Sequence, residues 1–124
     1  MNKTKGQLEA EISEAITRFE KEHLGRGPRE TKSFIIADLV LIRLKGILTP
    51  AEEKLAIEKG GATLIKEMRM RLIDSSQPML RDMIESITHS TVNSFLTDID
   101  PGTGERVFVF SLTENLENKL LKKF

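Results

Sequence analysis

The chain has 124 residues, of which 39% are hydrophobic and 31% are charged, and nineteen basic residues balance nineteen acidic ones. A chain of this length forms one ordinary domain and can bury its own core without a metal or a disulfide. It contains no cysteine, which excludes disulfides, thiolate nucleophiles, iron–sulfur clusters and cysteine-ligated zinc. We therefore expect residues 1–124 to form a single domain in a reducing cytoplasm.

Charge and hydropathy also argue against two kinds of partner. A net charge of zero gives no overall positive field with which to neutralise nucleic-acid phosphates. The longest apolar run, Leu39 to Ile42, is broken by Arg43 and is far shorter than the ~20 residues of a membrane helix. No apolar stretch follows the basic residues 1–6, so they do not resemble a secretory signal. We expect neither nucleic-acid binding nor direct membrane insertion.

The first predicted element is an amphipathic helix over about residues 4–24. Its apolar residues recur at steps of three and four, at Leu8, Ile12, Ala15, Ile16 and Phe19. Thr4 and Gln7 have the spacing of a capping box. Gly25 suits the left-handed position after a helix, and Pro28 follows it.

Residues 31–48 are rich in β-branched and apolar side chains but are too many for one strand, which predicts a hairpin that turns at Ala37-Asp38. A short helix is expected next, up to about Lys59. Thr49 serves as its N-cap, Pro50 fits the first helical position, and Glu52 completes a capping box.

A long helical pattern covers residues 64–87, and Pro78 inside it is expected to kink or split the helix near Ser75-Ser76. Two strands follow, over residues 91–99 and 106–112, with a turn at residues 100–104. Thr113 is expected to cap a final amphipathic helix. This α-β-β-α-α-β-β-α order predicts an α+β fold, with a four-stranded, mostly antiparallel sheet and helices packed on one face.

Three segments carry a resemblance to a known family. They are Gly25-Arg26-Gly27-Pro28, the stretch from Val40 to Glu52 (VLIRLKGILTPAE), and the stretch from Asp98 to Val107 with its Asp98-Ile99-Asp100-Pro101 and Thr103-Gly104-Glu105-Arg106 motifs. The opening Thr4-Lys5-Gly6-Gln7-Leu8-Glu9 is also similar. Together they resemble the MpsC-like proteins, which are named for a component of a sodium-translocating, membrane-potential-generating system. The resemblance implies an association with membrane components that handle sodium and inorganic carbon, and it brings no catalytic residues.

The best candidate for an anion site is the loop that contains Arg26 and Arg29, with Lys32 close behind. Glycines let a backbone approach a ligand, and guanidinium groups bind carboxylate, phosphate or bicarbonate in a bidentate manner. The alternative is structural, because the loop follows a helix C-terminus, whose dipole repels anions. In that interpretation Gly25 ends the helix and the arginines bind its last carbonyls.

The remaining polar residues do not form a recognisable reaction centre. Asp98, Asp100, Thr103 and Glu105 crowd one turn, but their spacing does not match a calcium loop, and Asp before Pro-Gly is typical of a turn. His23 and His89 lie far apart without patterned partners. No nucleophile–base pair, phosphate loop or dinucleotide motif is present. We expect no metal, no cofactor and no enzymatic activity.

Apolar residues in the last third of the chain exceed what one face of a sheet would bury, which favours a homodimer. The residues expected at its interface are Phe108, Phe110, Leu120, Leu121 and Phe124. The leading hypothesis is a non-enzymatic, dimeric accessory protein that contacts membrane transport subunits. The alternative is a domain that binds or senses a small anion through Arg26, Arg29 and Lys32.

Overall fold

The computed structural model describes residues 3–122 and confirms the predicted α+β order. The elements are α1 (Lys5–His23), β1 (Glu30–Ile36), β2 (Leu39–Lys45), α2 (Pro50–Ala56), α3 (Gly61–Thr88), β3 (Val92–Asp100), β4 (Glu105–Leu112) and α4 (Leu116–Leu121). Phe124 lies outside the described residues.

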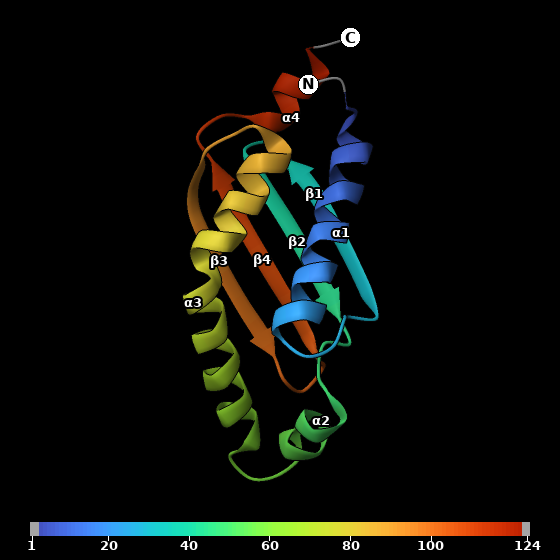
Figure 1. Ribbon diagram of the computed structural model, residues 1–124, viewed down its shortest axis with the longest axis vertical. Coiled ribbons are helices and arrows are strands. Elements are labelled where there is room, and N and C mark those ends of the chain that lie inside the picture. The colour runs from blue at the N-terminus through green and yellow to red at the C-terminus, as the bar shows by residue number, and fades with distance from the viewer. Residues whose placement is uncertain (1–2, 123–124) are drawn as a thin grey trace.

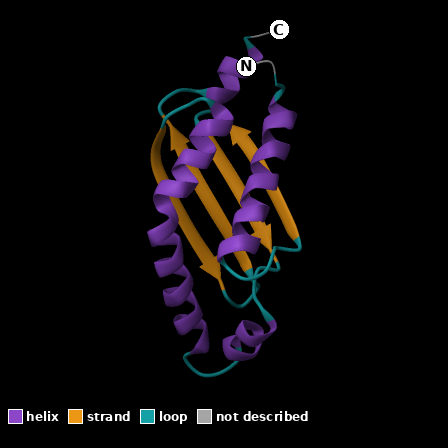
Figure 2. Cartoon of the chain, viewed as in Figure 1, coloured by secondary structure: helices purple, strands orange, loops and turns teal. Residues whose placement is uncertain are grey.

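The four strands form one sheet in the order β1-β2-β4-β3, and every neighbouring pair is antiparallel. β2 and β4 are the two central strands, so two hairpins that are distant in sequence meet through them. Figure 1 shows α1 and α3 lying across the same face of the sheet, with α2 beyond one end and α4 at the other. Figure 2 shows the same two-layer arrangement by type of element.

The core lies between the sheet and the two long helices. α1 contributes apolar side chains at four-residue steps, including Leu8, Ile12 and Ile16, which have no exposed surface. Alternate residues of β2 and β4 face these helix side chains. Residues four apart on the helix and two apart on the strands therefore pack together in one core layer. The core side chains of these strands are Val40, Ile42, Leu44, Phe108, Phe110 and Leu112.

Both predicted capping boxes are present. The hydroxyl of Thr4 accepts from the amide of Gln7, and the side chain of Gln7 accepts from the amide of Thr4. The same reciprocal pair joins Thr49 and Glu52 at the start of α2. α4 differs from the prediction, because Asn115 rather than Thr113 is its N-cap and accepts from the amide of Asn118. These bonds satisfy amide groups that the first turn of a helix leaves free.

α3 runs as one helix through Pro78, so the expected split near Ser75-Ser76 is wrong. Pro78 is exposed, and water can solvate the carbonyl group that loses its amide donor to the proline ring. The hydroxyls of Ser75 and Ser76 both donate to the carbonyl oxygen of Leu72 in the preceding turn. The helix therefore tolerates the proline on its solvent side.

The interface expected at Phe108 and Phe110 is also corrected by the structure. Both rings are fully buried beneath the helices, where they stack with Phe95 at centroid distances of 5.7 and 4.5 Å. Val107 and Val109 point to the other face of the sheet and are half-buried. Leu120 is buried as well, and only Leu121 of the expected set that the structure describes is exposed.

Candidate functional site

A pocket of about 340 Å³ lies at the end of the sheet where β1 begins and β2 ends. All three segments that carry the family resemblance contribute to it, although they are far apart in the sequence. We call it the arginine pocket. Its lining residues are Arg26, Arg29, Gly46, Leu48, Glu53, Ala56, Ile57, Pro101, Gly102, Thr103 and Gly104.

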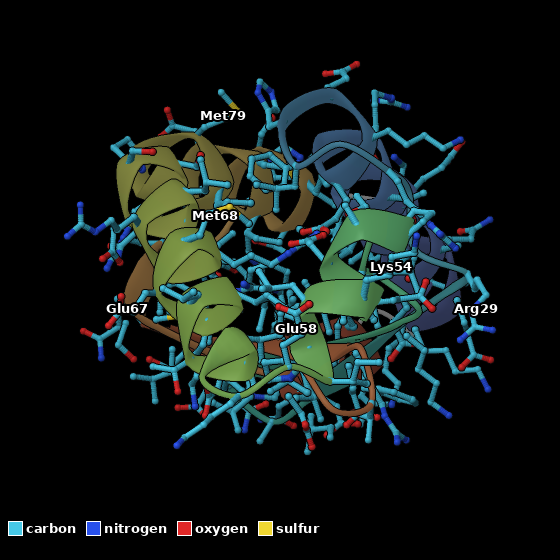
Figure 3. The ribbon with its side chains drawn as sticks, turned by 90° about the horizontal axis from the view of Figure 1, so that it is seen from below. Arg29, Lys54, Glu58, Glu67, Met68 and Met79 are labelled. Carbon is cyan, nitrogen blue, oxygen red and sulfur yellow. The ribbon has the colours of Figure 1, made fainter. Side chains whose placement is uncertain are left out.

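Contacts with the backbone at the end of β2 hold Arg29 in place at the pocket. Its amide donates to the carbonyl oxygen of Lys45 at 2.8 Å, which joins the start of β1 to the end of β2. Its side chain lies against the Cα atom of Gly46, where an added Cβ would overlap Nε of Arg29. Among residues 3–122 its guanidinium group has no ion-pair partner, and Figure 3 shows Arg29 at the edge of the molecule on the same side as α2. The group is therefore free to bind an anion.

Arg26 and Lys32 differ in their relation to this pocket. Arg26 lines it, and its guanidinium Nη1 lies 4.0 Å from the Glu53 carboxylate. Lys32 is not part of it, because its side chain projects from the other face of the sheet, with its ammonium 3.9 Å from Glu30. The structure thus brings together two of the three predicted cations.

The structural interpretation of the loop is partly fulfilled. Gly25 has a φ of 105° immediately after the helix, a conformation that favours glycine. The amide of Leu24 donates to the carbonyl of Glu20, which closes the last turn. In the described chain neither arginine donates a hydrogen bond to the last carbonyls of α1. Their side chains are directed to the pocket instead.

The acidic turn between β3 and β4 is built as a turn. Oδ1 of Asp100 accepts from the amide of Gly102, and its carbonyl oxygen accepts from the amide of Gly104. Asp98 pairs with Lys66 at 3.2 Å, and Glu105 pairs with Arg43 at 2.7 Å. The three carboxylates thus have separate partners. Residues 3–122 contain no group of three or more His, Asp or Glu side chains that could hold a metal ion.

A second polar feature lies inside the core. We call Glu20, Glu52, Arg69 and Arg106 the buried charge cluster. Nε and Nη2 of Arg69 donate to the two carboxylate oxygens of Glu52 at 2.8 and 2.7 Å, and Nη2 also donates to the carbonyl of Ile47 at 3.1 Å. This bidentate pair fastens α3 to α2 and to the segment that leaves β2.

The other two residues of the buried charge cluster, Glu20 and Arg106, lack several of the hydrogen bonds that their charged groups could make. Glu20 has no exposed surface, and its Oε1 lies 3.7 Å from Nη1 of Arg69. Arg106 donates through Nη1 to the hydroxyl of Thr97 at 2.9 Å, and its guanidinium lies 5.4 Å from the centre of the Phe108 ring. Five buried polar atoms of this cluster have no hydrogen-bond partner among the described residues. They are the two carboxylate oxygens of Glu20, Nη1 of Arg69, and Nε and Nη2 of Arg106. Burial without full hydrogen bonding disfavours the charged forms.

Protonation follows from this environment. Burial raises the pKa of Glu20 from 4.5 to about 7, although Arg106 and Arg69 oppose the shift. Burial likewise lowers the pKa of Arg106 to about 10, against the attraction of Glu20. For Glu52 burial is the largest single effect and raises the pKa, but the bonds from Arg69 and Thr49 outweigh it and hold the pKa below its usual value. The core therefore changes its charge near neutral pH through Glu20.

The sequence pattern missed this cluster, although a signal was present. Glu20 continues the four-residue series of Ile12 and Ile16 on the buried face of α1. Arg69 lies four residues after Ile65, and Arg106 alternates with Phe108 on the inward face of β4. A charged residue at a core position of each of three elements is the pattern that could have predicted a buried network.

No helix in residues 3–122 has both the length and the apolar composition needed to cross a membrane.

The fold and the arginine pocket define a small α+β domain whose open polar site suits the binding of a ligand or a partner. The sequence model of the family described as "Na+-translocating membrane potential-generating system (MpsC)" matches residues 4–114. The chain is also 47% identical over 122 residues to "Uncharacterized protein YbcI" of Bacillus subtilis (strain 168), with 98% of each chain covered. No solved structure matches it. The chain belongs to the MpsC family.

Proposed function

We propose that this protein is a non-enzymatic, cytoplasmic accessory protein of a sodium-dependent system that generates a membrane potential or transports inorganic carbon. The observation that carries the proposal is the match to the MpsC family over nearly the whole chain. The protein acts by binding membrane transport subunits rather than by entering the membrane itself.

The distribution of polar groups supports a binding role over a catalytic one. The most strongly shifted carboxylate, Glu20, is fully buried and cannot touch a substrate. The open arginine pocket holds two guanidinium groups and the Glu53 carboxylate but no serine or histidine. Its threonine, Thr103, belongs to the turn before β4 and has no histidine beside it in the lining. Such a pocket lacks the nucleophile–base pair of covalent catalysis.

Apolar residues on the outer side of α3 support protein contacts. Leu64, Met68, Leu72 and Met79 form a stripe along the helix, and each is between 38% and 57% exposed. Figure 3 shows Met68 and Met79 on this helix. Flexible methionine side chains adapt to the shape of a partner protein.

The proposal is tested in cells that lack the gene for this protein. A potentiometric dye would report the membrane potential as the external sodium concentration is varied. We expect a smaller sodium-dependent part of the potential in the deletion strain, and its return when the chain is supplied from a plasmid. An unchanged potential at every sodium concentration would overturn the proposal.

A second candidate function is the binding of a small anion in the arginine pocket, and the unpaired guanidinium of Arg29 favours it. Bicarbonate and phosphate both suit a pair of arginines. We expect either anion to raise the melting temperature of the wild type and not that of Arg29→Gln. Lys32→Gln is the matched control, because this variant loses the same charge outside the pocket. If neither anion stabilises the wild type, this function is excluded.

A further inference from the structure

One face of the sheet has no helix on it. Figures 1 and 3 show α1 and α3 on the same side of the sheet, and in the described part of the chain no element covers the opposite side. We call this side the open face. Its side chains come from alternate positions of the four strands: Glu30, Lys32, Phe34 and Ile36 of β1; Leu39, Leu41, Arg43 and Lys45 of β2; Glu105, Val107, Val109 and Ser111 of β4; and Ser94, Leu96, Asp98 and Asp100 of β3.

The open face is divided into an apolar end and a charged end. The strand register aligns Phe34 with Leu41, Leu41 with Val109 and Val109 with Leu96, so that one apolar row crosses all four strands. Phe34 is 42% exposed and Leu96 is 67% exposed. Ile36 and Leu39 extend this apolar area towards the hairpin turn. An exposed apolar row that crosses a whole face of a sheet is typical of a contact surface.

The charged end has opposite signs on its two sides. On β1 and β2 the open face carries Lys32, Arg43 and Lys45 against one carboxylate, Glu30. On β4 and β3 it carries only carboxylates, those of Glu105, Asp98 and Asp100. By formal charge the half formed by β1 and β2 is therefore positive and the other half is negative. Two of the three carboxylates also have a cation within the same chain, since Arg43 pairs with Glu105 and Lys66 of α3 pairs with Asp98.

We propose that a second copy of this chain covers the open face, related by a two-fold axis that runs parallel to the strands. This inference is independent of the proposed function. Such an axis places β1 of one copy over β3 of the other and β2 over β4, and it keeps each row opposite itself. The positive half of each copy then faces the negative half of its partner, and the apolar rows face each other.

Individual positions agree with this axis. Lys32 faces Asp98 of the other copy, Lys45 faces Glu105, and the apolar row places Phe34 opposite Leu96. Glu30 opposite Asp100 is the one repulsive pair, and Glu30 already has two lysines of its own strand pair within 4 Å, Lys32 at 3.9 Å and Lys45 at 3.7 Å. Each of these pairs occurs twice in the dimer because the interface is symmetric.

The other in-plane axis, perpendicular to the strands, is disfavoured by the same pattern. It would place β1 over β1 and β3 over β3. It would also reverse the rows, which brings the charged end of one copy onto the apolar end of the other. Charges buried against apolar side chains without partners are costly.

The size of the face approaches that of a specific interface. Four strands spaced about 4.8 Å apart and about seven residues long, at ~3.3 Å each, give a flat footprint of roughly 450 Å² per copy. Two copies then cover about 900 Å² before the relief of the side chains is counted, close to the ~1,000 Å² of a specific interface. The product is a four-layer arrangement with two packed sheets at its centre.

Sedimentation of the purified full chain tests the dimer itself. We expect the wild type to sediment as a dimer and Leu96→Glu to raise the dissociation constant about 10- to 100-fold, because a carboxylate replaces an apolar contact. Ile57→Glu is the matched control: Ile57 is 88% exposed but lies away from the open face, and this variant should remain dimeric. A wild-type monomer at all concentrations would overturn the proposal, whatever else binds to the face.

Thiol cross-linking tests the axis, and the cysteine-free chain gives no background. A mixture of Phe34→Cys and Leu96→Cys chains should form cross-linked dimers with a short bismaleimide, while neither variant alone should do so. In one chain these positions lie three strands apart, about 14 Å, and two equivalent positions in the dimer are further apart still, because the ~10 Å between the packed sheets adds to the same distance across the sheet. A link formed by either variant alone, or none in the mixture, would overturn this arrangement.

A charge exchange provides the second test of the axis. Lys32→Glu should weaken the dimer, and the double variant Lys32→Glu/Asp98→Lys should restore it to the dissociation constant of the wild type. If the double variant associates no more tightly than Lys32→Glu, these two residues do not face each other in the dimer.

Discussion

Replacement of Glu20 by glutamine is predicted to change how the stability of the protein depends on pH. The folded state raises the pKa of this carboxyl group from 4.5 to about 7, because burial outweighs the attraction of Arg106 and Arg69. Between these two values the folded protein holds a proton that the unfolded chain has lost. Unfolding therefore releases a proton, and the free energy of unfolding falls as pH rises towards 7. The stabilisation from this group is complete below pH 4.5 and is lost through the folded pKa.

The magnitude follows from the two pKa values. Linkage gives a loss of about 2 kcal/mol for the wild type between about pH 5.5 and pH 7.5, out of roughly 3 kcal/mol in total. Other carboxyl groups have a lowered pKa in the folded state, so at lower pH they make the free energy of unfolding rise with pH. The pKa values of Glu52, Asp98, Glu114 and Glu117 are lowered, so their stabilisation is lost as pH falls below their usual range of about 4. They remain ionised throughout the chosen window.

Urea denaturation at a series of pH values measures this effect. The wild type should lose about 2 kcal/mol across the window, while Glu20→Gln should stay nearly constant because it has no proton to lose at this position. Glu22→Gln, an exposed change on the same helix, is the control and should follow the wild type. If wild type and Glu20→Gln lose stability in parallel, Glu20 does not titrate as the buried environment requires.

Three further predictions concern stability and the arginine pocket. Arg69→Met leaves the buried carboxylates of Glu52 and Glu20 without their partner and should lower the free energy of unfolding by about 3–5 kcal/mol. The exposed change Arg71→Met should lower it by less than ~0.5 kcal/mol, and calorimetry measures both. A loss below about 1 kcal/mol for Arg69→Met would contradict this prediction. Gly61→Ala should destabilise, because its Cβ would overlap the carbonyl oxygen of Leu55. Gly6→Ala, with open space around it, should instead stabilise α1 by about 0.5–1 kcal/mol, and equal effects of the two changes would refute the packing at Gly61. Gly46→Ala should displace the Arg29 side chain and abolish any thermal shift with phosphate or bicarbonate; an unchanged shift would show that Arg29 does not hold the anion.

Local sequence signals were sufficient for most of the fold. The capping boxes at Thr4 and Thr49 fix the starts of two helices, because each is formed by residues three positions apart. The hairpin turn at Ala37-Asp38 was predicted from length alone, and Ala37 adopts a φ of 54° there. Its strained backbone is supported by Glu117, whose carboxylate accepts from the amide of Ala37. That contact spans 80 residues and could not be inferred from the turn itself.

The predictions that failed depend on the choice between two faces. The strand pattern correctly separates Phe108 and Phe110 from Val107 and Val109, but it does not say which pair lies under the helices. The larger rings fill the core, and the smaller valines remain on the open face. For a similar reason, only two of the three cations predicted for the anion site line the arginine pocket. Arg26 and Arg29 precede the sheet, whereas Lys32 lies within β1, where alternation directs its side chain to the opposite side.

The proposed role as an accessory protein requires that the chain sustains a sodium-dependent membrane potential. The most direct test is that potential, measured in deletion cells that produce either the wild type or no protein, at low and high sodium. We expect the wild type to restore the sodium-dependent part of the potential. The same potential in cells with and without the protein, at both sodium concentrations, would contradict it.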